Sequence, residues 1–377
     1  MKARAGDWVE VRRREEILET LDEKGRLDGL SFMPQMFNYC GQRFRVESRA
    51  YKTCDTVSGR YRGLRLPEAV HLSVRCDGQA YGGCQAGCLI FWKNAWLKPV
   101  DGPALAENVP DGNRAPFDDP HKQGARTDFD VCKSTTSKDR NGTTRYSCQA
   151  TELLTYTAPL KWWDARQYVE AYTSGNRSLL QVSRGLFYLF YYYATFSFSE
   201  RWGRPGRWLY NRFQAITGGI PFPRLKGKIA MGQPTPRYDL NLQAGDFVRV
   251  KSYDEILATL NTELSNRGLQ FDAELVPFCG KVFRVSTRVE RFVDERTGQM
   301  RRMKTPAVIL DGVTCKALFS GQRLFCPRSI NIWWREIWLE RVSPETHAGV
   351  PAPFKLGARA STEKNLLPEG YARTVRQ

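Results

Sequence analysis

The chain has 377 residues, 41% of them hydrophobic, so it can bury a sizeable core and wholesale disorder is excluded. Its 57 Lys and Arg residues outnumber 40 Asp and Glu residues, and the net charge of +17 favours an anionic partner such as nucleic acid, an acidic protein or anionic lipid. The basic residues are spread along the chain, which argues against a tethered polybasic arm.

A strand-like pattern begins within the first ten residues, which leaves no room for a signal peptide. No stretch of about 20 residues is free of charge, so no membrane-spanning helix is expected. We therefore expect a cytoplasmic location, where thiols are kept reduced. The ten cysteines then indicate metal ligands or buried thiols rather than disulfides.

The first predicted elements are short strands and one short helix. The segment DWVEV, residues 7–11, alternates apolar and polar residues as a half-buried strand does. Residues 14–21, REEILETL, place acids in the first turn of an apolar pattern with helical spacing, which predicts a helix. Further strands are predicted at RFRV (43–46), AVHLSV (69–74) and AWLKPV (95–100).

The same segment returns in the second half of the chain. GDWVEVRRREEILETL from Gly6 matches GDFVRVKSYDEILATL from Gly245 without a gap, and YCGQRFRV from Tyr39 matches FCGKVFRV from Phe278. Each copy spans about 95 residues, which indicates a duplicated domain rather than a solenoid repeat. The strand pattern resembles small SH3-like barrels, to which the helix and a cysteine loop would be additions.

The region between the copies changes character twice. Residues 101–145 are rich in Gly, Pro, Asp, Asn and Lys, which predicts a long linker. Asn141-Gly142 lies between two β-like runs and predicts a hairpin with Cys132 and Cys148 on adjacent strands. Residues 179–198 are apolar almost all round and predict a buried helix between the two copies.

A basic stretch follows that helix, since residues 201–228 contain no acid. Three interpretations stay open: a solvated loop whose tryptophans pack on the core, a membrane-surface contact, or a nucleic-acid site on which Trp202, Trp208 and Tyr210 stack. The candidate polyanion contacts, which include a loop of the second copy, are Arg201, Arg204, Arg207, Arg212, Arg224, Lys226, Lys228, Arg301, Arg302 and Lys304.

The cysteines of the first copy predict a metal site. Cys84 and Cys88 form a pair within GGCQAGC, where glycines free the backbone to wrap around an ion. Cys76 ends a strand eight residues before Cys84, and Cys54 follows the RFRV strand. We predict a four-thiolate site for Zn²⁺, with an iron–sulfur cluster as the alternative, at Cys54, Cys76, Cys84 and Cys88. Free buried thiols or a redox pair remain open.

The second copy keeps only half of that site. Cys315 and Cys326 match Cys76 and Cys84, whereas Val293 and Ile330 stand where Cys54 and Cys88 would be expected. An alternative second tetrad at the interface of the copies is Cys132, Cys148, Cys315 and Cys326. The matched pair Cys40 and Cys279 has no close second thiol in either copy and is interpreted as core packing.

No catalytic residue is assigned, because no recognised catalytic motif is present and the chain has three histidines. His71 matches Ile309 in the second copy, which favours a structural role. The two-copy pattern, with YSCQATEL and KWWDARQY between the copies, resembles a group of bacterial Cys-rich proteins with a duplicated SH3-like β unit. The resemblance covers most of the chain and implies that fold but no activity.

We therefore predict an α+β, mostly β protein: repeat 1 (residues 1–100), a linker with a hairpin (101–158), a helical aromatic and basic segment (159–240), repeat 2 (241–343) and a tail (344–377). The predicted function is a metal-stabilised binding or scaffold protein that engages a polyanion, either nucleic acid or an acidic protein surface. The alternatives are a metal- or thiol-dependent accessory enzyme of a bacterial biosynthetic pathway, and a subunit of a larger or membrane-associated assembly that makes contact through Leu186 to Phe198. No small-molecule substrate is identified.

Overall fold

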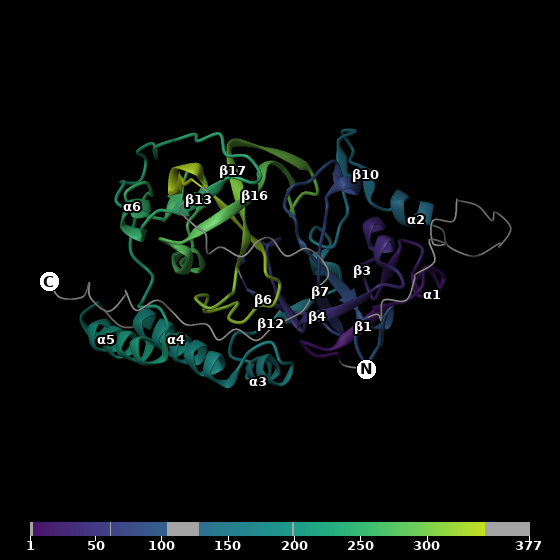
Figure 1. Cartoon of the computed structure of the whole chain (residues 1–377), viewed down its shortest axis with the longest axis horizontal. Coiled ribbons are helices and arrows are strands. Elements are labelled where there is room, and N and C mark those ends of the chain that lie inside the picture. Colours follow the sequence, from purple (N-terminus) through teal and green to yellow (C-terminus); the bar gives the residue numbers. More distant parts are fainter. Residues whose placement is uncertain (1–2, 61, 104–127, 198–199, 344–377) are drawn as a thin grey trace. The chain divides into compact units, whose positions relative to one another are not determined.

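The computed structural model describes residues 3–60, 62–103, 128–197 and 200–343 (Figure 1). It is mixed α+β with more strand than helix and with curled sheets, which confirms the predicted class at that level. Residues up to Arg341 form one unit. The predicted tail and residues 104–127 of the predicted linker lie outside the described residues.

Repeat 1 is built on a five-stranded sheet with the order β8-β7-β4-β1-β9. Val9 on β1, which lies between β4 and β9, stands opposite Phe44 and Pro99, and every pairing is antiparallel. Val9 and Val11 are buried while Glu10 between them is not, so the two-residue period of the sequence sets which face is inside. The strands are β1 (Trp8–Val11), β4 (Arg43–Arg49), β7 (Ala69–Arg75), β8 (Leu89–Lys93) and β9 (Leu97–Pro99).

Repeat 2 contains a sheet with the matching order, β18-β17-β16-β13-β19. Val248 on its β1 counterpart stands opposite Phe283 and Arg341, so the sequence match extends to strand register. The strands are β13 (Phe247–Val250), β16 (Val282–Val293), β17 (Met300–Thr314), β18 (Asn331–Trp334) and β19 (Leu339–Arg341).

The predicted short helix forms in both repeats, as α1 (Arg14–Leu18) and α6 (Tyr253–Leu257). Ser252 begins α6: its hydroxyl accepts a hydrogen bond from the Glu255 amide, and its own amide donates to the Glu255 carboxylate at 2.9 Å. This reciprocal pair satisfies two amides at the helix start. The short 3-10 helices are η1 (Pro34–Tyr39), η2 (Gln79–Tyr81), η3 (Asn94–Trp96), η4 (Leu153–Thr155), η5 (Ala273–Phe278) and η6 (Glu336–Trp338).

Each repeat has its own aromatic core. Phe32 packs edge-on against Trp96 with ring centroids 5.1 Å apart, and Phe271 packs against Trp338 at 5.2 Å. Both indole N–H groups donate to a threonine hydroxyl at the end of the preceding helix, at 3.1 Å in each case. A buried indole N–H needs a hydrogen-bond partner. This bond therefore fixes the position of each tryptophan side chain together with the burial of its apolar surface.

Outside the two main sheets the chain forms small two-stranded hairpins. The hairpin predicted around Asn141-Gly142 is present, but Cys132 lies on α2 (Asp128–Lys133) and Cys148 lies beyond β11, so neither is on a strand. The small strands are β10 (Thr136–Lys138) with β11 (Thr144–Tyr146), β2 (Arg26–Leu27) with β3 (Leu30–Ser31), and β14 (Ser265–Asn266) with β15 (Leu269–Gln270).

The repeats exchange hairpins. Hairpin 1, residues 51–66, contains β5 (Lys52–Cys54) and β6 (Gly63–Arg65). These two strands pair with each other, and β6 pairs with β12 (Ala158–Leu160) rather than with the main sheet. It packs on cysteine loop 2, residues 315–330, where the buried Lys52 ammonium donates to the Leu324 carbonyl. Hairpin 2, residues 290–301 at the tip of β16 and β17, packs in turn on cysteine loop 1, residues 76–88, where the Gln85 amide donates to the Arg291 carbonyl at 3.1 Å.

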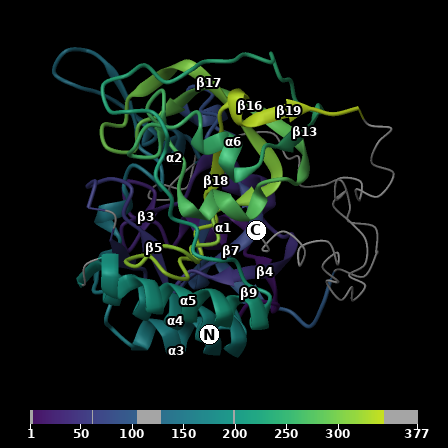
Figure 2. The same ribbon diagram turned by 90° about the vertical axis from the view of Figure 1, so that its left-hand side faces the viewer.

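The helical segment comprises α3 (Arg166–Thr173), α4 (Leu179–Ser197) and α5 (Glu200–Thr217), which lie together in both views (Figures 1 and 2). The prediction that residues 179–198 form a buried helix is corrected: the helix forms, but it lies at the surface with Phe190 70% exposed. Val182 and Leu189 pack on Phe325 of cysteine loop 2, and this contact buries only one face of α4. Among the described residues, no helix is both long and apolar enough to cross a membrane.

His71 makes stability depend on pH. Its Nδ1–H donates to the Ile90 carbonyl at 2.9 Å, and its Nε2 is buried with no partner among the described residues. Burial lowers the pKa of His71 from 6.5 to about 4, since protonation would place an unpaired charge in the core beside Arg328 and Arg75. The unfolded chain therefore binds more protons between those pH values, and stability is lost as pH falls through them.

We expect the wild-type chain to lose about 3 kcal/mol of unfolding free energy between pH 6.5 and 4 through this group alone. The His71→Ile variant, which copies Ile309 of repeat 2, should lack that part of the loss. Urea unfolding of both chains across this range measures it, and parallel stability curves would show that His71 does not titrate as its burial requires.

Candidate functional site

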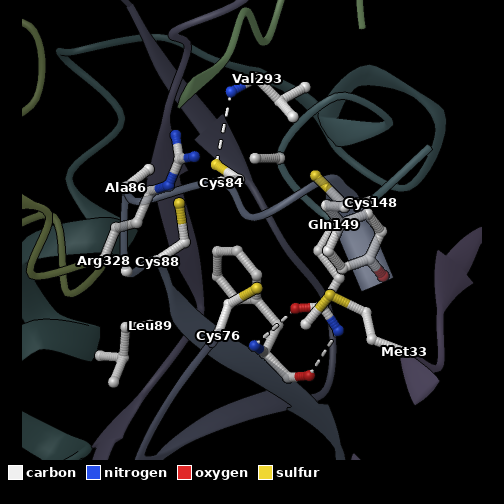
Figure 3. Close-up of a pocket in the computed structure, with 14 residues that line it drawn as sticks. Met33, Cys76, Cys84, Ala86, Cys88, Leu89, Cys148, Gln149, Val293 and Arg328 are labelled. Atoms are coloured by element: carbon white, nitrogen blue, oxygen red, sulfur yellow. Dashed lines mark hydrogen bonds between the residues drawn. The ribbon is translucent and has the colours of Figure 1, made fainter. Parts of the chain in front are cut away.

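Four thiols line one small cavity beneath cysteine loop 1 (Figure 3). Three of them, Cys76, Cys84 and Cys88, are members of the predicted tetrad, and the fourth is Cys148. The cavity has a volume of about 40 Å³ and is closed by apolar side chains, including Met33 and Leu89. All four cysteines are free of disulfides.

Gln149 brings Cys148 to this cavity. Its buried side chain accepts from the Phe91 amide and donates to the Phe91 and Ser31 carbonyls, each at 2.9 Å. One amide thus completes hydrogen bonds of strand β8 and locks residues 147–150 onto repeat 1. This link could not be predicted from the sequence, because Cys148 lies 60 residues from Cys88, beyond a linker, and only the adjacent glutamine offers a signal.

The structure does not bring Cys54 to the other three predicted ligands. Hairpin 1 carries Cys54 away from its own repeat and into a buried cluster with Ala317 and Cys326, against which Cys315 and Ile330 pack. The prediction of a Cys54, Cys76, Cys84 and Cys88 tetrad is therefore corrected in one member. The reason is physical: it assumed that a hairpin stays with its own sheet, whereas this one pairs with β12.

The two thiol groups occupy matching places in the two repeats. The Cys76 amide donates to the Cys88 carbonyl at 2.8 Å, and the Cys315 amide donates to the Ile330 carbonyl at the same distance. Hairpin 2 brings Val293 to loop 1, just as hairpin 1 brings Cys54 to loop 2. Positions 54 and 293 match in the sequence, and each residue lies at the cysteine loop of the other repeat.

The alternative tetrad also changes membership. Cys315 and Cys326 do lie together, but Cys148 belongs to the cavity of loop 1 and Cys132 is exposed on α2. Their third thiol is Cys54. Among the residues that the structure describes, no group of three or more His, Cys, Asp or Glu side chains has an arrangement that could hold a metal ion.

Burial controls the protonation of these thiols. Desolvation raises the pKa of Cys76 to about 12 and raises the pKa values of Cys88 and Cys148. In the second group a hydrogen bond between the Cys54 and Cys326 thiols lowers the pKa of Cys54 and raises that of Cys326, because one sulfur accepts the proton that the other retains. Cys76, Cys88 and Cys148 therefore stay protonated unless a cation displaces their protons.

Arg328 lies between the two thiol groups. It lines the loop 1 cavity, and its guanidinium donates to the Cys54 carbonyl at 3.3 Å and to the Thr56 hydroxyl at 2.7 Å. The other terminal nitrogen of the guanidinium, Nη2, donates to both carboxylate oxygens of Glu295, at 3.0 and 3.2 Å. This side chain, only 3% exposed, ties hairpin 1, hairpin 2 and loop 2 to one point, and no motif in the sequence indicated it.

A second candidate site is the outer face of α4 and α5. Large exposed apolar side chains on these helices include Phe190, Trp208 (68%), Leu209 and Ile216 (77%). Between the helices lies an apolar groove of about 210 Å³ lined in part by Phe190, Leu209, Gly203 and Gly206. A contiguous apolar face of this kind on a protein surface marks an interaction site.

The predicted polyanion contacts divide into available and occupied side chains. Arg224 is occupied, since it donates to the Tyr188 hydroxyl and to the Phe319 carbonyl, and Arg301 pairs with Asp294 at 3.5 Å. The side chain of Arg201 lies outside the described set. The exposed members are Arg204, Arg207, Arg212, Lys226, Lys228, Arg302 and Lys304.

A polar cavity of about 490 Å³ between the repeats is the largest hollow among those found. Its lining includes Glu47, Arg75, Asp311 and Lys316, so both signs of charge are present in equal number. Arg75 is already engaged, since it donates to the Gly87 and Ser329 carbonyls at 2.9 Å each. The size suits a small molecule, but the balanced charge selects neither an anion nor a cation.

Comparison with protein families, with curated proteins and with solved structures found no match to this chain. The candidate sites are therefore argued from their own residues.

The Arg328–Glu295 pair should contribute strongly to stability. We expect Glu295→Gln to lower the unfolding free energy by about 3 kcal/mol in urea, because it leaves a buried guanidinium without its counter-charge. The adjacent Asp294→Asn is the matched control: its partner Arg301 is 52% exposed, so the loss should stay below about 1 kcal/mol. Equal effects of the two substitutions would contradict this account.

Proposed function

We propose that this chain is a binding protein that docks on an anionic lipid surface through the outer face of α4 and α5. The observation that carries the proposal is the joint exposure of Phe190, Trp208, Leu209 and Ile216 on two adjacent helices whose inner faces are fixed to the protein. Single exposed apolar residues need no explanation, but a continuous face of large ones does.

The charge on this face supports an anionic partner. Arg204, Arg207 and Arg212 lie on α5 among the exposed apolar residues, and none of them forms an ion pair with a carboxylate of the described chain. Arg207 instead lies over the Phe222 ring, 5.4 Å from its centre. Arginine stems can cover apolar surface while their guanidinium groups reach lipid phosphates.

The aliphatic part of the face favours lipid over nucleic acid. Leu209 and Ile216 can neither stack on bases nor bond to phosphates, so nucleic acid would leave them in water. Acyl chains would cover them, and Trp208 suits the boundary between headgroups and acyl chains. We therefore propose that the anionic partner predicted from the sequence is a lipid surface with anionic headgroups.

The β part of the chain supports this role as a frame. We infer that repeats 1 and 2 are two copies of one SH3-like unit, on the strength of their matching strand orders and registers. Loop 2 of repeat 2 receives Val182, Leu189 and Tyr188 of α4. A rigid frame of this kind would present the helical pair without loss of conformational entropy on docking.

Vesicle sedimentation of the full chain tests the proposal. We expect binding to phosphatidylcholine vesicles that contain phosphatidylglycerol to be at least tenfold tighter than to pure phosphatidylcholine, since each basic residue near the surface contributes about 1 kcal/mol. Binding to a single-stranded oligonucleotide without binding to the acidic vesicles would overturn the lipid assignment, and so would equal affinity for both vesicle types.

A pair of substitutions locates the docking face. Leu209→Glu should weaken vesicle binding at least tenfold, because it removes about 2 kcal/mol of apolar burial and adds a repelled charge. Met231→Glu makes the same change of charge at a residue that is 54% exposed outside α4 and α5, and it should leave binding within about twofold of wild type. If both variants bind alike, the face is elsewhere.

A further inference from the structure

The cavity beneath loop 1 gathers four sulfurs from segments that the fold brings together. Cys76 follows strand β7, Cys84 and Cys88 belong to the glycine-rich loop, and Cys148 arrives on the segment anchored by Gln149 (Figure 3). We propose that Cys76, Cys84, Cys88 and Cys148 bind one divalent ion of the zinc class as thiolates. This site is independent of the proposed lipid docking.

The number and kind of donors fit such an ion. Structural zinc takes four ligands, and four thiolates at about 2.3 Å form one of its common sets. The cavity of about 40 Å³ holds little more than one water molecule, whose share of the liquid is about 30 Å³, so it suits a single ion rather than a larger group. Apolar side chains such as Met33 and Leu89 form part of the cavity wall, and Gln149 and Arg328 contribute polar groups to it.

N–H groups already point at these sulfurs. The Gln35 side-chain amide donates to Cys76 Sγ at 3.1 Å, and the Val293 backbone amide of hairpin 2 donates to Cys84 Sγ at 3.4 Å. Donors of this kind stabilise a thiolate and orient a metal ligand, whereas a neutral thiol is a weak acceptor.

The loop backbone is built for close approach. Gly78 has φ of +72°, and a Cβ there would stand 1.9 Å from the Cys84 carbonyl oxygen, so only glycine allows the loop to close over the cavity. At Gly87, with φ of +58°, a Cβ would stand 2.7 Å from the side-chain nitrogen of Asn331 in repeat 2. Both repeats therefore hold loop 1 in the shape that gathers its thiols.

Ion binding involves proton release and no oxidation. Each thiol gives its proton to solvent, and each sulfur donates a lone pair to the ion. The four thiols are not yet in ligand positions in the described structure, so binding includes a turn of the cysteine side chains toward the cavity centre. The matched group of loop 2 has three thiols with Ile330 in place of a fourth, and we assign no ion to it.

Metal analysis of the reduced full chain, dialysed after incubation with Zn²⁺, tests the site. We expect one bound zinc per chain in the wild type and in Cys54→Ser. In Cys148→Ser and Cys88→Ser the amount of zinc bound per chain should fall at least tenfold. Cobalt in place of zinc should give thiolate-to-cobalt charge transfer and the visible bands of tetrahedral Co²⁺. Equal loss in Cys54→Ser would assign the ion elsewhere, and iron with acid-labile sulfide would replace the single ion by a cluster; both overturn the proposal.

A measurement on the wild-type chain covers variants that fail to fold. Alkylation with N-ethylmaleimide followed by peptide mass spectrometry should show that zinc slows the modification of all four proposed ligands at least tenfold. Cys132, which is exposed on α2, serves as the internal control and should react at the same rate with or without zinc. Unchanged rates at Cys76, Cys84, Cys88 and Cys148 would overturn the site.

Discussion

One buried cation, the guanidinium of Arg328, holds the two exchanged hairpins in place. The guanidinium of Arg328 bonds to hairpin 1 through Cys54 and Thr56, and to hairpin 2 through Glu295. The N–H groups of the guanidinium lie in one plane and donate hydrogen bonds only in a narrow range of directions, so they fix where the two hairpins meet. Since hairpin 2 also supplies the amide that bonds to Cys84, the geometry of the thiol cavity depends on a charge that belongs to the other cysteine loop.

Cysteine loop 2 links the two candidate sites. On one side it holds Cys54 of hairpin 1, and on another it receives α4, where Gly185 lies so close to Phe325 that a Cβ would stand 2.2 Å from the ring. The exposed helical face is therefore an extension of repeat 2 and not a separate appendage. A basic, apolar surface and a thiol cavity thus share one rigid support, although their chemistry is unrelated.

Local patterns in the sequence predicted local structure well. The alternation in DWVEV, the acids before Ile17 and the Asn141-Gly142 turn each specify a strand, a helix or a hairpin through neighbouring residues, and all three are present. The partners of Cys54 and Cys148 could not be predicted, because each depends on which repeat a distant segment packs against. The outer face of α4 was missed for a related reason: an apolar sequence predicts burial, and only the packing of Leu189 and Phe190 shows which side is covered.

The duplication that we propose implies an ancestor with a single repeat, and the exchange of hairpins has a consequence for that ancestor. Such a chain would have no neighbour to wall its own cysteine loop, so it would be complete only as a symmetric homodimer with two identical thiol pockets. Fusion of the pair into one polypeptide removes that symmetry requirement. Each pocket can then diverge on its own, as the isoleucine at position 330 and the cysteine at position 88 illustrate.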